Sequence, residues 1–226
     1  MKSKITFLLI LAIFAASCKK TTDVNVTVST SGKLTYKLVD DGGKGIPNVK
    51  VSLFDNINSY YNTSVLLDTR STDQNGVADF GDLNPSTYLV VPDSPMVNNI
   101  KYFFREYVQV ITGNTKQRDV KVSDFSATLN LNVKLYSTGL ALKNAGVLLI
   151  PSNKFVYSTS IANLSGIAEF KGVTTDNGAA TFKVPSTKAY TIVIYNMSTN
   201  IVSTTYTYFS LDKGATVNLS MITYSF

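Results

Sequence analysis

The chain repeats one series of strand and turn signals at a separation of roughly 100 residues. Matching pairs are Lys37 and Lys134, Tyr88 and Tyr190, and Gly113 and Gly214, at offsets of 97, 102 and 101. Each tyrosine follows a Pro-Ser-Thr segment, and the Thr72–Phe80 segment matches Thr175–Phe182. Because a near-constant offset over several segments is hard to obtain by chance, we expect two copies of one domain, at residues 31–125 and 126–226.

Short runs rich in β-branched and aromatic residues indicate strands, for example residues 33–39, 49–53 and 189–195. Asp-Asp-Gly-Gly, Asp-Gln-Asn-Gly and Asp-Asn-Gly segments between such runs favour tight turns. Only two Glu occur in the chain, Glu106 and Glu169, and no segment of helical period follows the first 20 residues. The sequence therefore predicts an all-β chain with an antiparallel sandwich in each half.

One strand of the second half has two possible matches in the first. Gly76, which precedes a strand ending at Phe80, can correspond to Gly178 or to Gly166. We favour Gly178, because its distance to Tyr190 equals the distance from Gly76 to Tyr88. Residues 165–170 would then form an additional hairpin strand.

Residues 1–17 have the layout of a bacterial signal peptide. Two lysines precede an apolar run from residue 5 to 14, and small residues lead to Cys18, the single cysteine of the chain. Small residues before a cysteine resemble a lipobox, in which Cys18 becomes lipidated and forms the mature N-terminus. Residues 18–30 are then the lipidated cysteine and a polar tether, although Val24, Val26 and Val28 could also pair as a leading strand.

The expected partner of the N-terminus is a membrane, through this lipid. Lys19 stands after Cys18, where Asp is the familiar signal for retention in the inner membrane, so the segment resembles that of an outer-membrane lipoprotein. Lys20 and the two threonines after it match a surface-export signal only in part. Whether the protein faces the periplasm or the cell surface therefore stays open.

Composition excludes several classes of function. The chain has no histidine, which rules out a Ser-His-acid triad, and its single cysteine rules out an intrachain disulfide or a CxxC site. The net charge is +6, but the lysines are scattered and the arginines are few, so we expect no nucleic-acid partner. We expect no enzymatic activity, no catalytic residue, no metal site and no cofactor.

The order of signals resembles the carboxypeptidase-regulatory-like and Cna-B-like families. In the first half the matching segments are Asp40–Gly43, Pro47–Val51, Thr72–Phe80 and Pro85–Tyr88. The second half matches less well, because it has no proline equivalent to Pro47. The resemblance implies two tandem Greek-key sandwiches of the prealbumin (transthyretin) type, used as a spacer, stalk or binding accessory.

Cna-B-like domains often join a first-strand lysine to an asparagine with the help of a buried glutamate. Lys37 and Lys134 lie in the matching strand, but no glutamate follows Tyr88 or Tyr190 closely. Without a carboxyl group to transfer the proton, the amide bond has no route to form. We therefore expect Lys37 and Lys134 to face outward.

Loop residues leave two further candidates. Turn aspartates such as Asp40, Asp73 and Asp79 could act as paired carboxylates or bind calcium, but we expect them to bond their own backbone. Tyr60 and Tyr61 lie among asparagines and serines, a combination that suits a glycan or protein partner, while half-buried tyrosines at a strand end are the alternative. The segment at residues 102–107 is also aromatic and is expected to be core.

The sequence thus predicts a non-enzymatic, lipid-anchored protein of the outer membrane. It would be a structural or binding module that holds a β-sandwich surface away from the bilayer. A glycan-binding accessory of a polysaccharide-uptake system and an adhesin or pilus-related subunit are the alternatives.

Overall fold

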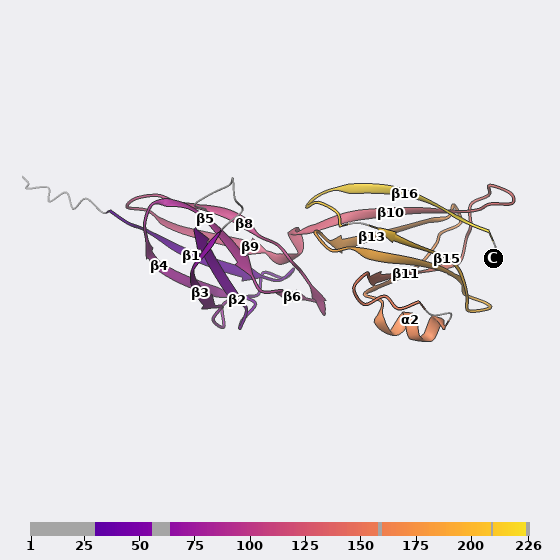
Figure 1. Cartoon of the computed structure of the whole chain (residues 1–226), viewed down its shortest axis with the longest axis horizontal. Helices are drawn as coiled ribbons and strands as arrows, with labels where there is room; N and C mark the ends of the chain where they lie inside the picture. Colours follow the sequence, from indigo (N-terminus) through magenta and orange to yellow (C-terminus); the bar gives the residue numbers. More distant parts are fainter. Residues whose placement is uncertain (1–29, 56–63, 158–159, 209, 225–226) are drawn as a thin grey trace, which may run out of the picture.

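The computed structural model describes residues 30–55, 64–157, 160–208 and 210–224. Its strands form two groups that lie end to end along the longest axis (Figure 1). The strands of the first group are β1 (Gly32–Val39), β2 (Lys50–Asp55), β3 (Val65–Ser71), β4 (Val77–Leu83), β5 (Ser86–Pro92), β6 (Met96–Val97), β7 (Ile100–Lys101), β8 (Glu106–Val110) and β9 (Thr115–Lys121). We call residues 30–121 the first half.

A 3-10 turn, η1 (Val122–Asp124), leads into the second half, residues 126–224. Its elements are β10 (Ser126–Leu135), β11 (Ala145–Pro151), α2 (Ile161–Ile167), β12 (Phe170–Val173), β13 (Ala179–Pro185), β14 (Tyr190–Asn196), β15 (Ile201–Tyr208) and β16 (Thr216–Thr223). Among the described residues, no helix is long and apolar enough to cross a membrane.

Both halves have the same strand order. In the first half the sheets are β4-β1-β9 and β3-β2-β5-β8, and in the second they are β13-β10-β16 and β12-β11-β14-β15. The all-β prediction is therefore confirmed. The strands are not all antiparallel, however, because β1 pairs with β9, and β10 with β16, in parallel. The first and last strands of each half are not joined by a hairpin, so nothing in the connection forces them to run in opposite directions.

Each half has a core of its own between its two sheets. Strand β1 shows why, since Leu34, Tyr36 and Leu38 are fully buried while Thr35 and Lys37 between them are half-buried. This period of two is the pattern of a strand with one face toward the core. Leu129, Leu131 and Val133 repeat it in β10.

Helix α2 was not expected from the sequence, and the additional strand predicted at residues 165–170 is wrong. Strand β11 is buried on both faces, and α2 covers the outer one by packing Ile161 and Leu164 against Leu148 and Ile150. Ser160 caps the helix through the backbone N–H of Asn163. The helix has only 7 residues, too few for its apolar period to stand out in the sequence.

The match of Gly178 to Gly76 is confirmed. Both glycines have a positive φ, 77° and 74°, and their carbonyls accept equivalent hydrogen bonds, of 2.8 Å from the N–H of Leu38 and 2.9 Å from that of Val133. A Cβ on either glycine would lie within 2.4 Å of a backbone oxygen. Both positions therefore require glycine on two grounds, the left-handed conformation and the close backbone contact.

Two other sequence matches are wrong by one or two residues. Thr72 corresponds to Thr174 and not to Thr175, because each accepts one backbone N–H and donates to one backbone carbonyl. The partners are Val49 and Ile46 for Thr72, and Ala145 and Leu142 for Thr174. Lys37 corresponds to Asn132 rather than to Lys134, since these two pair with Val77 and Ala179 at equivalent places. The offset grows from 95 in the first strand to 102 at Gly178 mainly because α2 lengthens the connection before β12.

Candidate functional site

The residues predicted to carry function from the sequence lie mostly outside the described ranges. Cys18 falls in residues 1–29, and Tyr60 and Tyr61 fall in residues 56–63. Lys134 is exposed and Lys37 is half-buried, and the neighbours of Lys37 in β1 face the core, as expected for outward-facing lysines. The sites that can be built from the structure are therefore different ones.

The turn aspartates bond their own backbone, as predicted. Asp40 Oδ1 accepts the N–H groups of residues 42 and 44, and Asp73 Oδ1 accepts those of residues 75 and 77. Asp79 does the same for Gly81. No group of three or more potential metal-ligating side chains occurs within the described ranges. These carboxylates fix turns and do not converge on a common site.

The connection between the halves is short and buried. Strand β9 ends at Lys121 and β10 begins at Ser126, while Val122 and Phe125 between them are buried. The carbonyl of Phe125 accepts both the N–H and the hydroxyl of Ser186, at 2.9 and 3.0 Å. Ser186 of the second half thus fixes the backbone of the connection at Phe125, and the connection has little freedom to bend.

A second contact reaches from the second half to the first. Thr187 has a φ of 62°, and its hydroxyl donates a 2.6 Å hydrogen bond to the carbonyl of Phe103. The N–H of Thr187 bonds Leu211 within its own half. A non-glycine residue with positive φ costs conformational energy, so this geometry is held by its contacts on both sides. The prediction that the aromatic segment at residues 102–107 is core is only partly right. Tyr102 and Phe104 are buried, whereas Phe103 and Tyr107 are 45% and 60% exposed. The Phe103 ring lies near Lys188 of the second half.

Glu169, Lys188 and Tyr190 form a partly buried polar cluster beside this contact. Lys188 Nζ lies 2.6 and 2.7 Å from the two carboxylate oxygens of Glu169, and the Tyr190 hydroxyl donates to Oε2 at 2.9 Å. Burial, and then the negative charge of Glu169, raise the pKa of Tyr190 far above its ordinary value. The Lys188 ammonium also lies 5.8 Å from the ring centre of Phe103. The cluster is thus a set of satisfied charges that supports the contact between the halves.

The first half has a comparable cluster at a different place. Arg118 of β9 binds Glu106 of β8 with two hydrogen bonds of 2.9 and 2.8 Å, which link the edges of the two sheets. Tyr36 of β1 lies close by, and burial followed by the charge of Glu106 raises the pKa of its hydroxyl strongly. The hydrogen bond to Glu106 in turn raises the pKa of Arg118. Neither cluster was expected from the sequence, although the only two glutamates of the chain were a signal for both.

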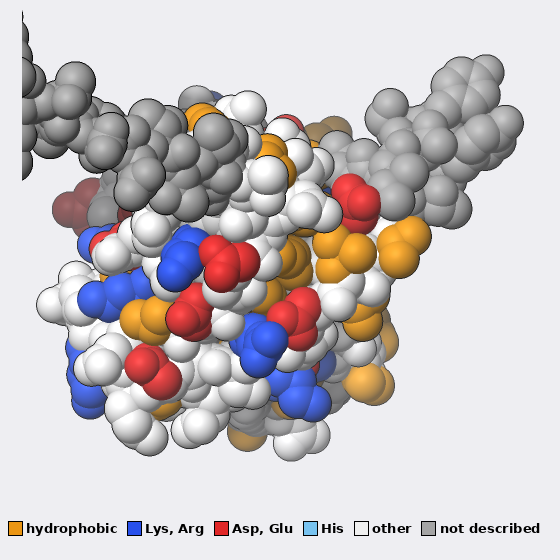
Figure 2. Space-filling model, turned by 90° about the vertical axis from the view of Figure 1, so that its left-hand side faces the viewer, with side chains coloured by type: hydrophobic (Ala, Val, Ile, Leu, Met, Phe, Trp, Pro, Cys, Tyr) orange, Lys and Arg blue, Asp and Glu red, His pale blue; other side chains and the backbone are white. Residues whose placement is uncertain are grey.

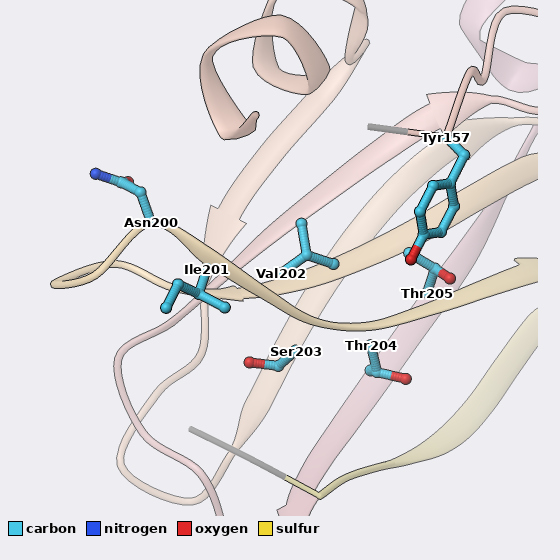
Figure 3. Close-up of a pocket in the computed structure, with 7 residues that line it drawn as sticks. All are labelled: Tyr157, Asn200, Ile201, Val202, Ser203, Thr204 and Thr205. Atoms are coloured by element: carbon cyan, nitrogen blue, oxygen red, sulfur yellow. The ribbon is translucent and has the colours of Figure 1, made fainter. Parts of the chain in front are cut away.

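A hollow of about 220 Å³ lies along β15. Figure 3 shows its lining, which consists of residues 200–205 and Tyr157, whose ring reaches over the strand toward Thr205. No charged residue lines it. General acid–base catalysis needs a titratable group within reach of the substrate, and this lining offers only the phenol of Tyr157, which is mostly exposed.

The outer end of the first half carries charges of both signs. Figure 2 shows lysine, arginine, aspartate and glutamate side chains interspersed over this face, with hydrophobic side chains gathered toward one edge. This face therefore presents no extended patch of one sign.

Comparisons with known proteins give a limited result. No family model matches the chain, and no curated protein matches it. Among solved structures, the minor pilin GBS52 of Streptococcus agalactiae is similar with a TM-score of 0.40 and 13% identity, over 87% of this chain and 97% of that one. The TIE protein of Bacillus anthracis gives 0.38 and 17%, over 86% of this chain but 34% of that chain.

The shaft pilin SpaA of Lactobacillus rhamnosus GG gives a TM-score of 0.33 and 14% identity, over 87% of this chain and 99% of that one. With TM-scores of 0.40 or lower, these similarities are too weak to assign a fold or a function to this chain. The β-sandwich assignment rests on the strand order and on the two cores described above.

Proposed function

We propose that this chain is a non-enzymatic structural module of the bacterial cell envelope. In this proposal two tandem Greek-key sandwich domains of the prealbumin type form a stiff spacer. A signal peptide, residues 1–17, is removed, and a lipid on Cys18 anchors the spacer to the outer membrane. A binding surface would be held at the far end of the spacer.

The observation that carries the proposal is the braced connection between the halves. Ser186 holds the connection at Phe125, and Thr187 holds the first half at Phe103. The described chain enters at one end of the long axis and ends at the other (Figure 1). A spacer needs these two properties, length between its ends and resistance to bending. The polar clusters support a structural role too, because both glutamates are already paired with a cation.

Small-angle X-ray scattering on the purified protein tests the stiffness. We expect one maximum dimension that matches the end-to-end arrangement of the halves. Insertion of Gly-Ser-Gly-Ser between Asp124 and Phe125 should broaden the distance distribution. The control is the same insertion after Gly113, in an open turn between β8 and β9. A wild type as broadly distributed as the Asp124 insertion would overturn the spacer.

The lipid anchor needs its own test. Cys18→Ala should release the protein from the membrane fraction and abolish labelling with a fatty-acid analogue. Ser17→Ala, which keeps a small residue before the cysteine, is the matched control and should stay membrane-bound. A wild type that carries no acyl chain would contradict the anchor and leave the two-domain spacer to be judged by scattering alone.

Glycan binding is a second candidate, favoured by a polar face of the second half. On the outer side of β13-β10-β16, the Asn130 amide donates to Asn218 at 2.9 Å and accepts from the Thr181 hydroxyl at 2.9 Å. These side chains border a shallow hollow of about 470 Å³. Amide and hydroxyl groups on a flat face suit the hydroxyls of a polysaccharide.

Retention on polysaccharide affinity gels tests this candidate. Asn130→Ala/Asn218→Ala and Tyr60→Ala/Tyr61→Ala should each weaken retention if their groups form the binding surface. Lys154→Ala, an exposed change elsewhere in the second half, is the control. If no tested polysaccharide retains the wild type, the structural role stands alone. It would then include a shaft or adhesin subunit, the remaining alternative.

A further inference from the structure

A hollow of about 550 Å³ lies where the two halves meet, and it is larger than the hollow along β15. Its apolar wall comes from Phe103 and Phe104 of the first half and from Phe125 of the connection. The rings of Phe104 and Phe125 are stacked, with centres 3.8 Å apart and planes 14° from parallel. Because all three rings are anchored in the braced contact between the halves, the hollow is a built feature of the fold.

Two cations border this apolar wall. The Lys213 ammonium of the second half lies 3.7 Å from the ring centre of Phe125, and Arg105 of the first half lines the same hollow. No acidic residue is part of the lining. Within the described ranges neither cation takes part in an ion pair. Two positive charges from different halves therefore converge on one apolar space.

The hydroxyl groups at the hollow are already engaged as donors. Thr187 donates to the carbonyl of Phe103, and Ser186 donates to that of Phe125. The donors that remain belong to Lys213 and Arg105, and both carry a positive charge. Hydrogen bonds between ionised groups are stronger than neutral ones, so this lining favours an anion over a neutral polyol. An apolar body on the ligand would fit against the phenylalanine rings, where burial of nonpolar surface stabilises binding.

We propose that this hollow binds a small organic anion, with its aliphatic or aromatic body on Phe103, Phe104 and Phe125 and its carboxylate on Lys213 and Arg105. Such a ligand touches both halves at once. Its binding therefore stabilises the contact between them and raises the temperature at which they separate. This goes beyond the spacer role, which does not depend on any ligand.

Isothermal titration with decanoate, below its micelle concentration, tests the site on the purified full chain. We expect saturable binding of one decanoate per chain. Lys213→Ala should weaken the affinity at least fivefold, and Lys213→Ala/Arg105→Ala at least tenfold. Lys134→Ala, an exposed lysine at the other end of the second half, should stay within twofold of the wild type. Decyltrimethylammonium, with the same chain and opposite charge, should not bind.

Two further measurements distinguish binding in the hollow from a loss of folding and from binding to a lipid surface. Phe103→Ala removes the half-exposed ring but keeps the carbonyl that Thr187 binds, so it should weaken decanoate binding at least threefold. The melting temperature of the ligand-free protein should fall by a few degrees at most, because the ring's contact with Lys188 is long, at 5.8 Å. Binding to phosphatidylglycerol vesicles is measured in parallel, and decanoate should not displace it. Absence of saturable decanoate binding, equal affinity in the double variant, or equal binding of the cationic analogue would each overturn the proposal. Vesicle binding that requires Lys213 and is displaced by decanoate would also overturn it, because the occupant would then be a lipid surface.

Discussion

The two halves share their turns but not their charges. Thr72 and Thr174 make the same pair of backbone hydrogen bonds, and Gly76 and Gly178 have the same left-handed conformation against the same neighbouring carbonyl. The glutamates, in contrast, occupy places that do not correspond. Glu106 links two sheet edges within the first half, and Glu169 lies beside the contact between the halves. The backbone of this fold thus requires the repeated residues, while the ionic clusters serve each half differently.

The ends of the two halves that lie farther from the N-terminus extend this comparison. Asp41 of the first half bonds Ser123 in η1, where the chain continues into the second half. The equivalent positions of the second half hold Tyr136 and Tyr224, whose ring centres lie 4.7 Å apart and whose side chains are 64% and 73% exposed. A polar pair at the covered end is therefore replaced by an aromatic pair at the open end. The two halves thus share their backbone frame and differ in the side chains at this end.

The largest effect should come from the shared glycines. Gly76→Ala and Gly178→Ala each force a side chain into a left-handed position and within 2.4 Å of a backbone oxygen. We expect a loss of about 4 kcal/mol in the free energy of unfolding of the half that carries the change. Urea denaturation followed by hydrogen exchange in each half measures it.

Gly43→Ala is the matched control for this pair. Gly43 also has a positive φ, of 80°, but nothing lies within 4 Å of an added Cβ. It should cost about 1 kcal/mol, the strain of the conformation alone. A Gly178→Ala effect no larger than that of Gly43→Ala would break the equivalence of the two turns.

The next largest effect should be a difference in stability between variants of the two glutamates. Glu169→Gln leaves the Lys188 ammonium, with a side chain only 12% exposed, beside a neutral amide and should cost about 3 kcal/mol. Glu106→Gln should cost about 1 kcal/mol, because the Arg118 side chain is 41% exposed and water can take over its charge. Urea denaturation of the two variants compares them, and Glu169→Gln/Lys188→Met should recover part of the larger loss. Equal losses for the two single variants would show that burial does not separate the clusters.

The repeated threonines should give a smaller and equal effect. Thr72→Val and Thr174→Val keep the shape of the side chain but leave a buried backbone N–H, of Val49 or Ala145, without its acceptor. Each should cost about 2 kcal/mol in thermal unfolding. Serine at the same positions keeps the hydroxyl and should recover at least half of that loss. If only one of the two valine variants loses stability, the equivalent hydrogen bonds do not contribute equally to the stability of the two halves.

The turns and the strand pattern could be predicted from the sequence because they depend on local chemistry. Glycine at Gly76 and Gly178, and the alternation of Leu34, Tyr36 and Leu38, are dictated by the backbone conformation and by burial on one face. The parallel pairing of β1 with β9 could not be predicted, since the pattern of a single strand does not say in which direction its neighbour runs.

The candidate sites depend on contacts between distant residues, and the sequence indicated them only weakly. Lys188 meets Glu169, 19 positions away, through the folding of the second half alone. Thr187 meets Phe103, 84 positions away, only because the two halves are placed end to end. One local signal was available for α2. Residues 145–150 form an unbroken apolar run, which indicates a strand covered on both faces and hence a further element above it.

The smallest expected effect is a pH dependence confined to the first half. The hydrogen bond from Ser123 lowers the pKa of Asp41 below its ordinary value of 3.8; desolvation opposes this shift, and the positive charge of Lys121 at 3.6 Å supports it. A carboxylate whose pKa is lower in the folded state stabilises that state where it is ionised. This stabilisation is therefore complete above the unfolded-state pKa and is lost as the pH falls below about 4 through the folded-state value. The equivalent position in the second half is Tyr136, which is not acidic.

Thermal unfolding of the wild type and of Asp41→Asn between pH 6 and pH 2, followed by hydrogen exchange in each half, tests this difference. At pH 6 the variant should be slightly less stable in the first half, and the gap should close as the pH falls and Asp41 becomes protonated in the wild type as well. Asp82→Asn, on the same half but at its outer end, controls for the loss of one negative charge. Because Asp41 is half-exposed and its charge is screened, the shift in melting temperature should be a few degrees at most. A gap that widens toward low pH would mean that Asp41 destabilises this end, and that the polar pair at the covered end does not help to fix the connection.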